Sequence, residues 1–232
     1  MSDIIILVIA SRGEFYDQFI NEYWIPMIKY AKKYNNIKIF LIFGNDSKID
    51  DLSDIKDNIL VFNHAETMPN ILEKTLDAFD LCLKNYNFDF VLRTNLSSFI
   101  MLDKLIVTAN NIPKNNFIGG SLGVTEKGIR FVGGAAMLFS KDVIENLIDN
   151  RKSIINESID DVDMGNYMQN KFTYTFIDKV DLYFFKIPLI DAHLNHVIND
   201  IKKSKLYQVR LKNPNRNVDV QIMKALTPIY YS

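Results

Sequence analysis

The first apolar run of the chain constrains its fold most. Residues 4–10 read Ile-Ile-Ile-Leu-Val-Ile-Ala, with no polar interruption and mostly β-branched side chains. Such a run is typical of a central strand in a parallel sheet, because that strand is buried on both faces. The run is too short to span a bilayer, and Asp3 precedes it instead of a basic segment. We therefore expect neither a membrane span nor a signal peptide here.

Segments typical of strands and helices alternate after this run. This alternation predicts an α/β fold with a central, mostly parallel mixed sheet flanked by helices. Carboxyl ends of parallel strands face a ligand crevice, so the loops after residues 10, 43 and 93 should meet at one site. After residue 113 the pattern changes, and we expect strands and loops laid across the first half. We expect strands at 37–43, 59–62 and 88–93, and helices at 14–34, 69–86 and 141–150.

Composition bounds the class of protein. A length of 232 residues suits one domain over 1–232, and a hydrophobic fraction of 48% with 24% charged residues is ordinary for a globular chain. A net charge of −1 gives no overall attraction to nucleic acid. Cys82 is the only cysteine, which excludes an intrachain disulfide and a cysteine zinc site. We expect a cytoplasmic protein, with Cys82 as a buried hydrophobe and the oligomeric state left open.

Small polar side chains follow the strand predicted at 88–93. Arg93, Thr94, Asn95 and Ser97 stand where a crevice should be, and oxygen-rich loops there can hold a metal, a ribose or a phosphate. An ordinary strand exit, in which these side chains satisfy loose backbone groups, explains them equally well.

An acidic cluster, Asp160-Asp161-Val162-Asp163, is the strongest candidate for chemistry. A carboxylate in a partly apolar cleft can take a proton from an attacking hydroxyl, and like-charged neighbours raise its pKa. The alternative is an acidic first turn of a helix over about 162–170, stabilised by the helix dipole.

Two glycine-containing segments can let backbone approach a substrate closely. Gly133 and Gly134 begin a run of small residues, which also suits tight strand–helix packing. Ser11 and Arg12 precede Gly13 after the first strand, where Arg12 can meet a phosphate. The alternative there is a turn with a solvated arginine.

Basic residues gather again near the carboxyl terminus. Arg210 and Lys212 alternate onto one face of a predicted strand, close to Arg216, and such a group can clamp a diphosphate. A solvated edge strand is the alternative. His193 and His196 share a helix face, more typical of a surface helix than of a metal site.

Four blocks in order resemble the glycosyltransferases of the Fringe and β-1,3-galactosyltransferase type, which have the GT-A fold. Arg93-Thr94 and Phe99 match the surroundings of that family's D-x-D motif, although Asn95, Leu96 and Ser97 replace its acids. The other blocks are Glu66 with Asn70 and Lys74-Thr75, the glycine-rich stretch 131–143, and Asp160-Asp161-Val162-Asp163-Met164-Gly165.

The resemblance implies sugar transfer from a nucleotide-sugar donor, a UDP-sugar in the first instance, to a hydroxyl of a glycan or glycosylated acceptor. It implies inversion at the anomeric carbon and assigns the base to Asp161. It also implies donor or sugar contacts for Ser11, Arg12 and Asp160. Acceptor contacts are expected from the loops at 45–58 and 171–206.

The missing acids of the D-x-D motif change the expected cofactor. That carboxylate pair holds Mn²⁺ or Mg²⁺, which neutralises the leaving diphosphate. We therefore expect no required metal, with Arg210, Lys212 or Arg216 neutralising the charge instead. The alternatives are a catalytically inactive protein of the same fold that binds a sugar or nucleotide, and, ranked last, a nucleotidyltransferase.

Overall fold

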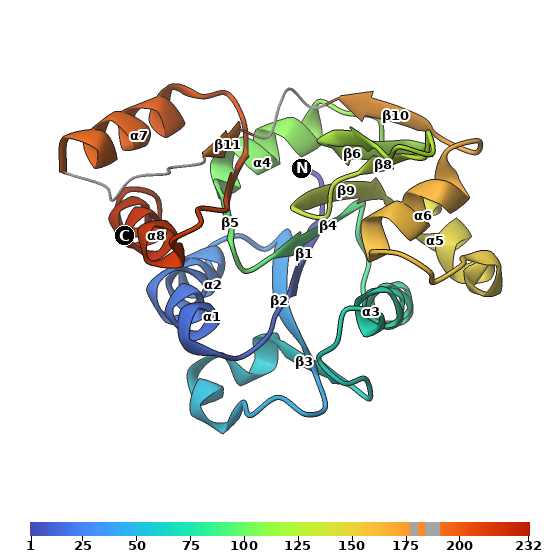
Figure 1. Cartoon of the computed structure of the whole chain (residues 1–232), viewed down its shortest axis with the longest axis horizontal. Coiled ribbons are helices and arrows are strands. Elements are labelled where there is room, and N and C mark those ends of the chain that lie inside the picture. Colours follow the sequence, from blue (N-terminus) through green and yellow to red (C-terminus); the bar gives the residue numbers. More distant parts are fainter. Residues whose placement is uncertain (177–180, 184–190) are drawn as a thin grey trace.

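The computed structural model describes residues 1–176, 181–183 and 191–232. Its main sheet is seven-stranded within this part of the chain, and each strand is parallel to its neighbours except β9, which is antiparallel to both of its own (Figure 1). In spatial order the strands are β10 (Thr173–Phe176), β6 (Phe117–Gly120), β9 (Ala136–Ser140), β4 (Phe90–Asn95), β1 (Ile4–Ile9), β2 (Ile37–Gly44) and β3 (Ile59–Phe62).

The predicted mixed parallel sheet is confirmed, but the expected place of its second half is wrong. The segments around 117–120 and 136–140 do not lie across the first half. They extend the same sheet, because β9 runs back beside β4 with Leu138 opposite Leu92, and β6 then pairs with β9. The remaining strands make a small sheet of β11 (Asp181–Tyr183), β12 (Gln208–Leu211) and β5 (Ser98–Ile100), and a hairpin of β7 (Leu122–Val124) and β8 (Arg130–Val132).

Helices cover both faces of the main sheet, and β1 shows why. Ile4, Ile6 and Val8 belong to one hydrophobic cluster, whereas Ile5 and Leu7 belong to another. The first cluster includes side chains of α1 (Glu14–Phe19), α2 (Ile25–Ala31), α4 (Leu102–Asn110), α7 (Asp191–Lys203) and α8 (Arg216–Tyr230). The second includes side chains of α3 (Asn70–Asn85), α5 (Lys141–Asp149) and α6 (Asp160–Met168). Short 3₁₀ segments cover Asp50–Asn58 and Arg151–Ser153.

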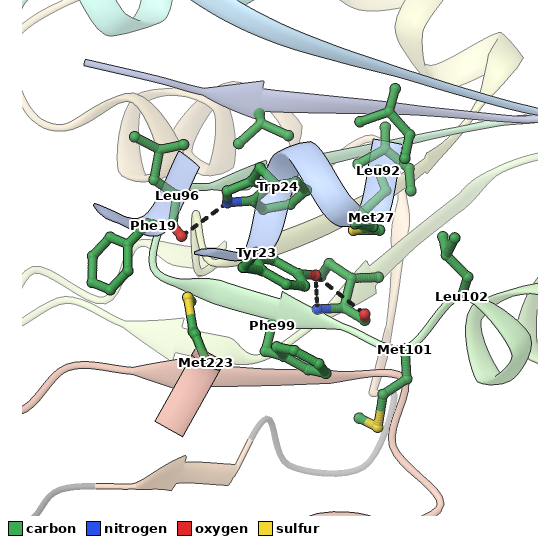
Figure 2. Close-up of a cluster of buried hydrophobic side chains, with 14 of the residues drawn as sticks. Phe19, Tyr23, Trp24, Met27, Leu92, Leu96, Phe99, Met101, Leu102 and Met223 are labelled. Carbon is green, nitrogen blue, oxygen red and sulfur yellow. Dashed lines mark hydrogen bonds between the residues drawn. The ribbon is translucent and has the colours of Figure 1, made fainter. Parts of the chain in front are cut away.

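The helix predicted over 14–34 is interrupted by a π-helical turn at Ile20–Trp24. Pro26 follows at the start of α2, where its missing N–H removes a helical hydrogen bond. Figure 2 shows that this turn contacts both the β4–β5 connection and β5. The Trp24 indole donates to the Leu96 carbonyl at 3.0 Å in the connection, and the Tyr23 hydroxyl accepts from the Ile100 amide of β5 at 2.6 Å. The turn therefore anchors the segment that carries Asn95 and Ser97.

None of the helices that the structure describes is both long enough and apolar enough to cross a membrane.

Candidate active site

Two adjoining cavities form one cleft at the carboxyl ends of β1 and β4. The first compartment has a volume of about 650 Å³ and the second of about 590 Å³, and both are lined by Ile9, Ile71 and Asn95. The predicted meeting of the loops after residues 10 and 93 is therefore observed. Of the predicted site residues, the first compartment contains Arg93, Gly133, Gly134, Asp160 and Asp161, the second contains Ser11 and Ser97, and both contain Asn95, Arg210 and Lys212.

Arg93 is a buried residue that lines the first compartment. It lies on β4, and its guanidinium donates hydrogen bonds to the Asp160 carboxylate and to the Gly134 carbonyl. Burial raises the pKa of the Asp160 carboxyl, and the charge of Arg93 opposes that effect. A buried charge is tolerated only when it is paired, so Arg93 and Asp160 serve to hold the compartment together.

Asp161 lies beside this pair at the first turn of α6. Its Oδ2 accepts a hydrogen bond from the Gly134 amide at 2.7 Å, and its Oδ1 accepts one from the Val162 amide at 2.9 Å. The side chain lines the first compartment although little of it is exposed. Asp163 accepts from the Ser158 amide at 3.0 Å and lines a different cavity. The acidic cluster therefore contributes Asp160 and Asp161, but not Asp163, to the cleft.

The two adjacent glycines have different surroundings. A Cβ built on Gly134 would lie 2.5 Å from Nη1 of Arg93 and 3.3 Å from Oδ2 of Asp161. A Cβ on Gly133 would meet only the Ser121 carbonyl, at 3.6 Å. Gly134 therefore makes room for the charged side chains, whereas Gly133 leaves open space in the compartment.

The oxygens at the position of the D-x-D motif are engaged within the protein. Oδ1 of Asn95 accepts from the Ser97 and Ser98 hydroxyls at 3.1 and 3.2 Å. The buried Thr94 hydroxyl donates to the Ala135 carbonyl at 2.5 Å and lines neither compartment. Across the described ranges, no group of three or more His, Cys, Asp or Glu side chains could hold a metal ion. The neutral residues at the position of the D-x-D motif therefore do not fit a divalent cation.

Arg210 reaches both compartments from β12. Its Nη1 is buried and has no hydrogen-bond partner among the residues that the structure describes. Burial lowers the pKa of Arg210 to about 10, and the charges of Arg216 and Arg93 act in the same direction. The group is still a cation near neutral pH. The charge of Asp219 acts in the opposite direction, but no carboxylate of the described residues forms an ion pair with Arg210.

The other basic residues of this region are held differently. Lys212 is exposed and lines both compartments. Arg216 lines the second compartment, but its guanidinium already donates to the Asp219 carboxylate and, at 3.0 Å, to the Leu211 carbonyl. Arg210 is therefore the best placed of the three to bind an added anion.

Arg12 lines neither compartment. Its guanidinium donates to Asp17 at 2.5 Å, to Asp51 at 2.6 and 2.8 Å, and to the Lys48 carbonyl at 2.7 Å. The hydrogen bonds to Asp51 raise the pKa of Arg12 well above its usual range. The sequence did not reveal these partners. Because they take up the hydrogen-bond donors of Arg12, the predicted contact between Arg12 and a phosphate is not observed.

One ion pair beside the cleft joins Glu66 and Lys74, two residues of a sequence block that resembles Fringe-type enzymes. Lys74 on α3 is buried and lies 2.8 Å from Oε2 of Glu66, and it also donates to the Ala10 carbonyl at 3.3 Å. Glu66 in turn accepts from the Gly44 amide and from the Ser11 hydroxyl. The pair joins the ends of β1 and β2. Its contacts with Ala10 and Gly44 come from distant segments, which the spacing of the two residues does not reveal.

The remaining predicted contacts are absent from the cleft or only partly described. No residue of 45–58 lines either compartment, so the predicted role of the loop after residue 43 is not observed. Within 171–206, residues 177–180 and 184–190 lie outside the described ranges. His196 is exposed on α7 and lies 3.3 Å from Asp200, and the side chain of His193 also lies outside the description.

Comparisons with known proteins bear on the fold. The sequence matches no protein-family model and no curated protein. Among solved structures, a glycosyltransferase involved in glycosylating the major capsid of PBCV-1 superposes with a TM-score of 0.59 at 10% identity, over 96% of this chain and 99% of that one. Galactosyltransferase LgtC, in complex with donor and acceptor sugar analogs, superposes with a TM-score of 0.52 at 9% identity, over 99% and 96%.

These neighbours agree with the GT-A type predicted from the sequence, and the resemblance to Fringe-type enzymes in particular stays a prediction. The superpositions span nearly the whole of this chain and of each neighbour. The chain therefore has the fold of the GT-A glycosyltransferases.

Proposed function

We propose that this protein transfers a sugar from a nucleotide-sugar donor, a UDP-sugar in the first instance, to a hydroxyl of a glycan or glycosylated acceptor. The observation that carries the proposal is the pairing of two groups in one cleft. The Arg210 guanidinium has a buried, unpartnered nitrogen among the described residues, and the Asp161 carboxylate lines the compartment that Arg210 shares. The first suits a diphosphate and the second suits an attacking hydroxyl.

In the proposed reaction the acceptor oxygen forms a bond to the anomeric carbon, and the bond from that carbon to the donor phosphate breaks. The acceptor hydroxyl gives its proton to the Asp161 carboxylate, and the electron pair leaves with the nucleoside diphosphate. Arg210, together with Lys212, takes up the charge of the leaving group. Inversion at the anomeric carbon follows from the resemblance of the acidic motif to Fringe-type enzymes.

We further propose that the reaction requires no divalent metal. Support comes from the residues at the D-x-D position, where Asn95 accepts two serine hydroxyls and Leu96 is apolar. Support also comes from Asp160, whose carboxylate is paired with Arg93. Buried cations can replace a metal ion in stabilising a diphosphate, since both act by placing positive charge at the leaving oxygens.

The second candidate is a catalytically inactive protein that binds a nucleotide or sugar. Both oxygens of Asp161 accept backbone hydrogen bonds, which a purely structural carboxylate at a helix start also does. The two candidates share the basic compartment and differ in whether Asp161 moves a proton.

A thermal-shift screen tests the proposal, with UDP, GDP, CMP and dTDP and their sugars in EDTA and in Mn²⁺. A ligand that binds only the folded form raises the melting temperature. We expect UDP or a UDP-sugar to raise it in EDTA. Stabilisation only with Mn²⁺ would contradict metal independence, and no stabilisation by any nucleotide would contradict the proposed donor class.

A further inference from the structure

The two compartments of the cleft differ in chemistry. The second compartment contains Arg216, Ser11 and Ser97 in addition to the shared basic residues. The first contains three large apolar side chains that the second lacks, Met68, Phe131 and Ile159, which we call the apolar shelf. The second has Tyr16, Leu96 and Pro214 instead. A diphosphate and ribose match the second compartment, so the shelf lies on the side left for the other substrate.

Two residues of the apolar shelf are exposed. Met68 is 65% exposed and Ile159 is 40% exposed, although both line the cavity that holds Asp161. Their loops are joined, because the Asn156 side chain donates to the Pro69 carbonyl at 2.9 Å. Exposed apolar surface inside a cleft marks a contact with a ligand that has apolar surface of its own.

Phe131 is held in place from two sides. A Cβ on Gly123 would collide with the end of the Phe131 ring, and a Cβ on Gly165 would collide with the Cβ of Phe131. The absence of a side chain at Gly165 lets the hairpin strand β8 pack closely on α6, and its absence at Gly123 leaves room for the Phe131 ring beside the neighbouring strand β7. The aromatic part of the shelf is therefore rigid, which reduces the entropy lost when a ligand packs on it.

We propose that the acceptor carries an alkyl aglycone, as a glycolipid does, and that this chain lies on the apolar shelf while the reacting hydroxyl faces Asp161. The inference rests on the proposed function. Ile159 immediately precedes the two acids of the cleft, so an acceptor whose hydroxyl reaches Asp161 passes beside it. A fully polar acceptor would leave the exposed parts of Met68 and Ile159 against water or polar groups, with no gain from burying them.

Direct binding of simple glycosides tests this inference without requiring catalysis. Octyl and methyl β-D-glucosides and β-D-galactosides are titrated into the full chain by calorimetry, below the critical micelle concentration and with UDP present. We expect an octyl glycoside to bind at least about tenfold more tightly than its methyl counterpart, which corresponds to burying about two methylene groups.

Variants of the apolar shelf test whether it causes the preference for octyl glycosides. The double variant Met68→Ser/Ile159→Ser should reduce the octyl-to-methyl affinity ratio to below about threefold. Val107→Ser is the matched control, because Val107 is 61% exposed on α4 and lines neither compartment. It should keep the wild-type ratio.

Three results would overturn the inference: equal affinities for octyl and methyl glycosides, an octyl preference that survives in the double variant, or no binding of either octyl glycoside. A parallel UDP titration on the same preparations separates the two proposals. UDP binding without an octyl preference defeats the acceptor inference alone. An octyl preference without UDP binding defeats the proposed donor instead.

Discussion

The backbone amide of Gly134 donates a hydrogen bond of 2.7 Å to the carboxylate of Asp161. The Gly134 carbonyl meanwhile accepts from the guanidinium of Arg93, which also pairs with Asp160. One glycine at the start of the turn into β9 thus fixes the candidate base and its charged neighbour together. The proposed chemistry depends on this position having no side chain.

Gly134→Ala should therefore reduce transfer strongly. The new Cβ would lie 2.5 Å from Nη1 of Arg93 and 3.3 Å from Oδ2 of Asp161, so both groups must shift. Displacements of about 1 Å at a catalytic group can cost about 100-fold in rate. Gly133→Ala is the control, because its Cβ meets nothing closer than 3.6 Å. Equal rates of UDP release in the two variants would refute the role assigned to Gly134.

Arg210→Met should stabilise the free protein and weaken its binding of UDP. The lowered pKa of Arg210, caused first by burial, means that folding disfavours the cation, at about 1.4 kcal/mol for each pKa unit. A neutral side chain of similar length removes that cost, and a gain of 1 kcal/mol raises Tm by about 2–4 °C in a chain of this size. Differential scanning calorimetry and UDP titration measure the two effects.

Lys212→Met provides the comparison for Arg210. Lys212 is exposed, so its removal should weaken UDP binding without raising Tm. If Arg210→Met lowered Tm and left UDP binding intact, Arg210 would be a structural residue and the proposed neutralisation of the diphosphate would be wrong.

Trp24→Phe should lower both stability and nucleotide affinity. The substitution removes the 3.0 Å hydrogen bond to the Leu96 carbonyl and leaves that buried acceptor without its partner, at a cost of about 1–3 kcal/mol. The β4–β5 connection, which carries Ser97 into the second compartment, would lose an anchor. Tyr34→Phe removes a hydrogen bond to Asp103 on the surface and serves as the control. UDP affinity unchanged in Trp24→Phe would show that the anchor does not position the cleft.

Cys82 should be inert in the native protein. It is fully buried, and burial raises the pKa of its thiol to about 12. Because the thiolate is the reactive form and a raised pKa keeps the thiol protonated below that value, Ellman's reagent should not label the folded chain between pH 7 and 9. Denaturant should expose one thiol. Rapid labelling of the native protein would contradict the burial of α3.

Much of the sheet could be predicted from local sequence. The apolar run 4–10 gave one buried strand, and β3 was predicted with its observed bounds, since short apolar runs between turn residues leave few alternatives. The antiparallel return of β9 beside β4 could not be predicted, because strand pairing is set by contacts between distant segments. The π turn before Pro26 could not be predicted either, because the helical periodicity of 14–34 continues across it.

In the cleft, too, some features could be predicted from local sequence and others depend on contacts between distant segments. Asp160 and Asp161 were predicted to lie in a crevice, and both line it. Nothing in the local pattern distinguished Arg12 from Arg210, yet Asp17 and Asp51 occupy the first, while a nitrogen of the second has no partner in the described part of the chain. Whether a basic residue is free depends on the acids that the fold brings to it.

The most direct test of the central claim is an assay of UDP release in EDTA. The donors are UDP-glucose, UDP-galactose and UDP-N-acetylglucosamine, and the acceptor is water or an added glycoside. The wild-type protein should release UDP from one donor. Asp161→Asn should reduce that rate by at least about 100-fold while still binding UDP, because it removes the proposed base and keeps the shape of the side chain. Asp163→Asn, in a different cavity, should keep the wild-type rate. Equal rates for wild-type and Asp161→Asn proteins, or UDP binding without release from any donor, would contradict the account.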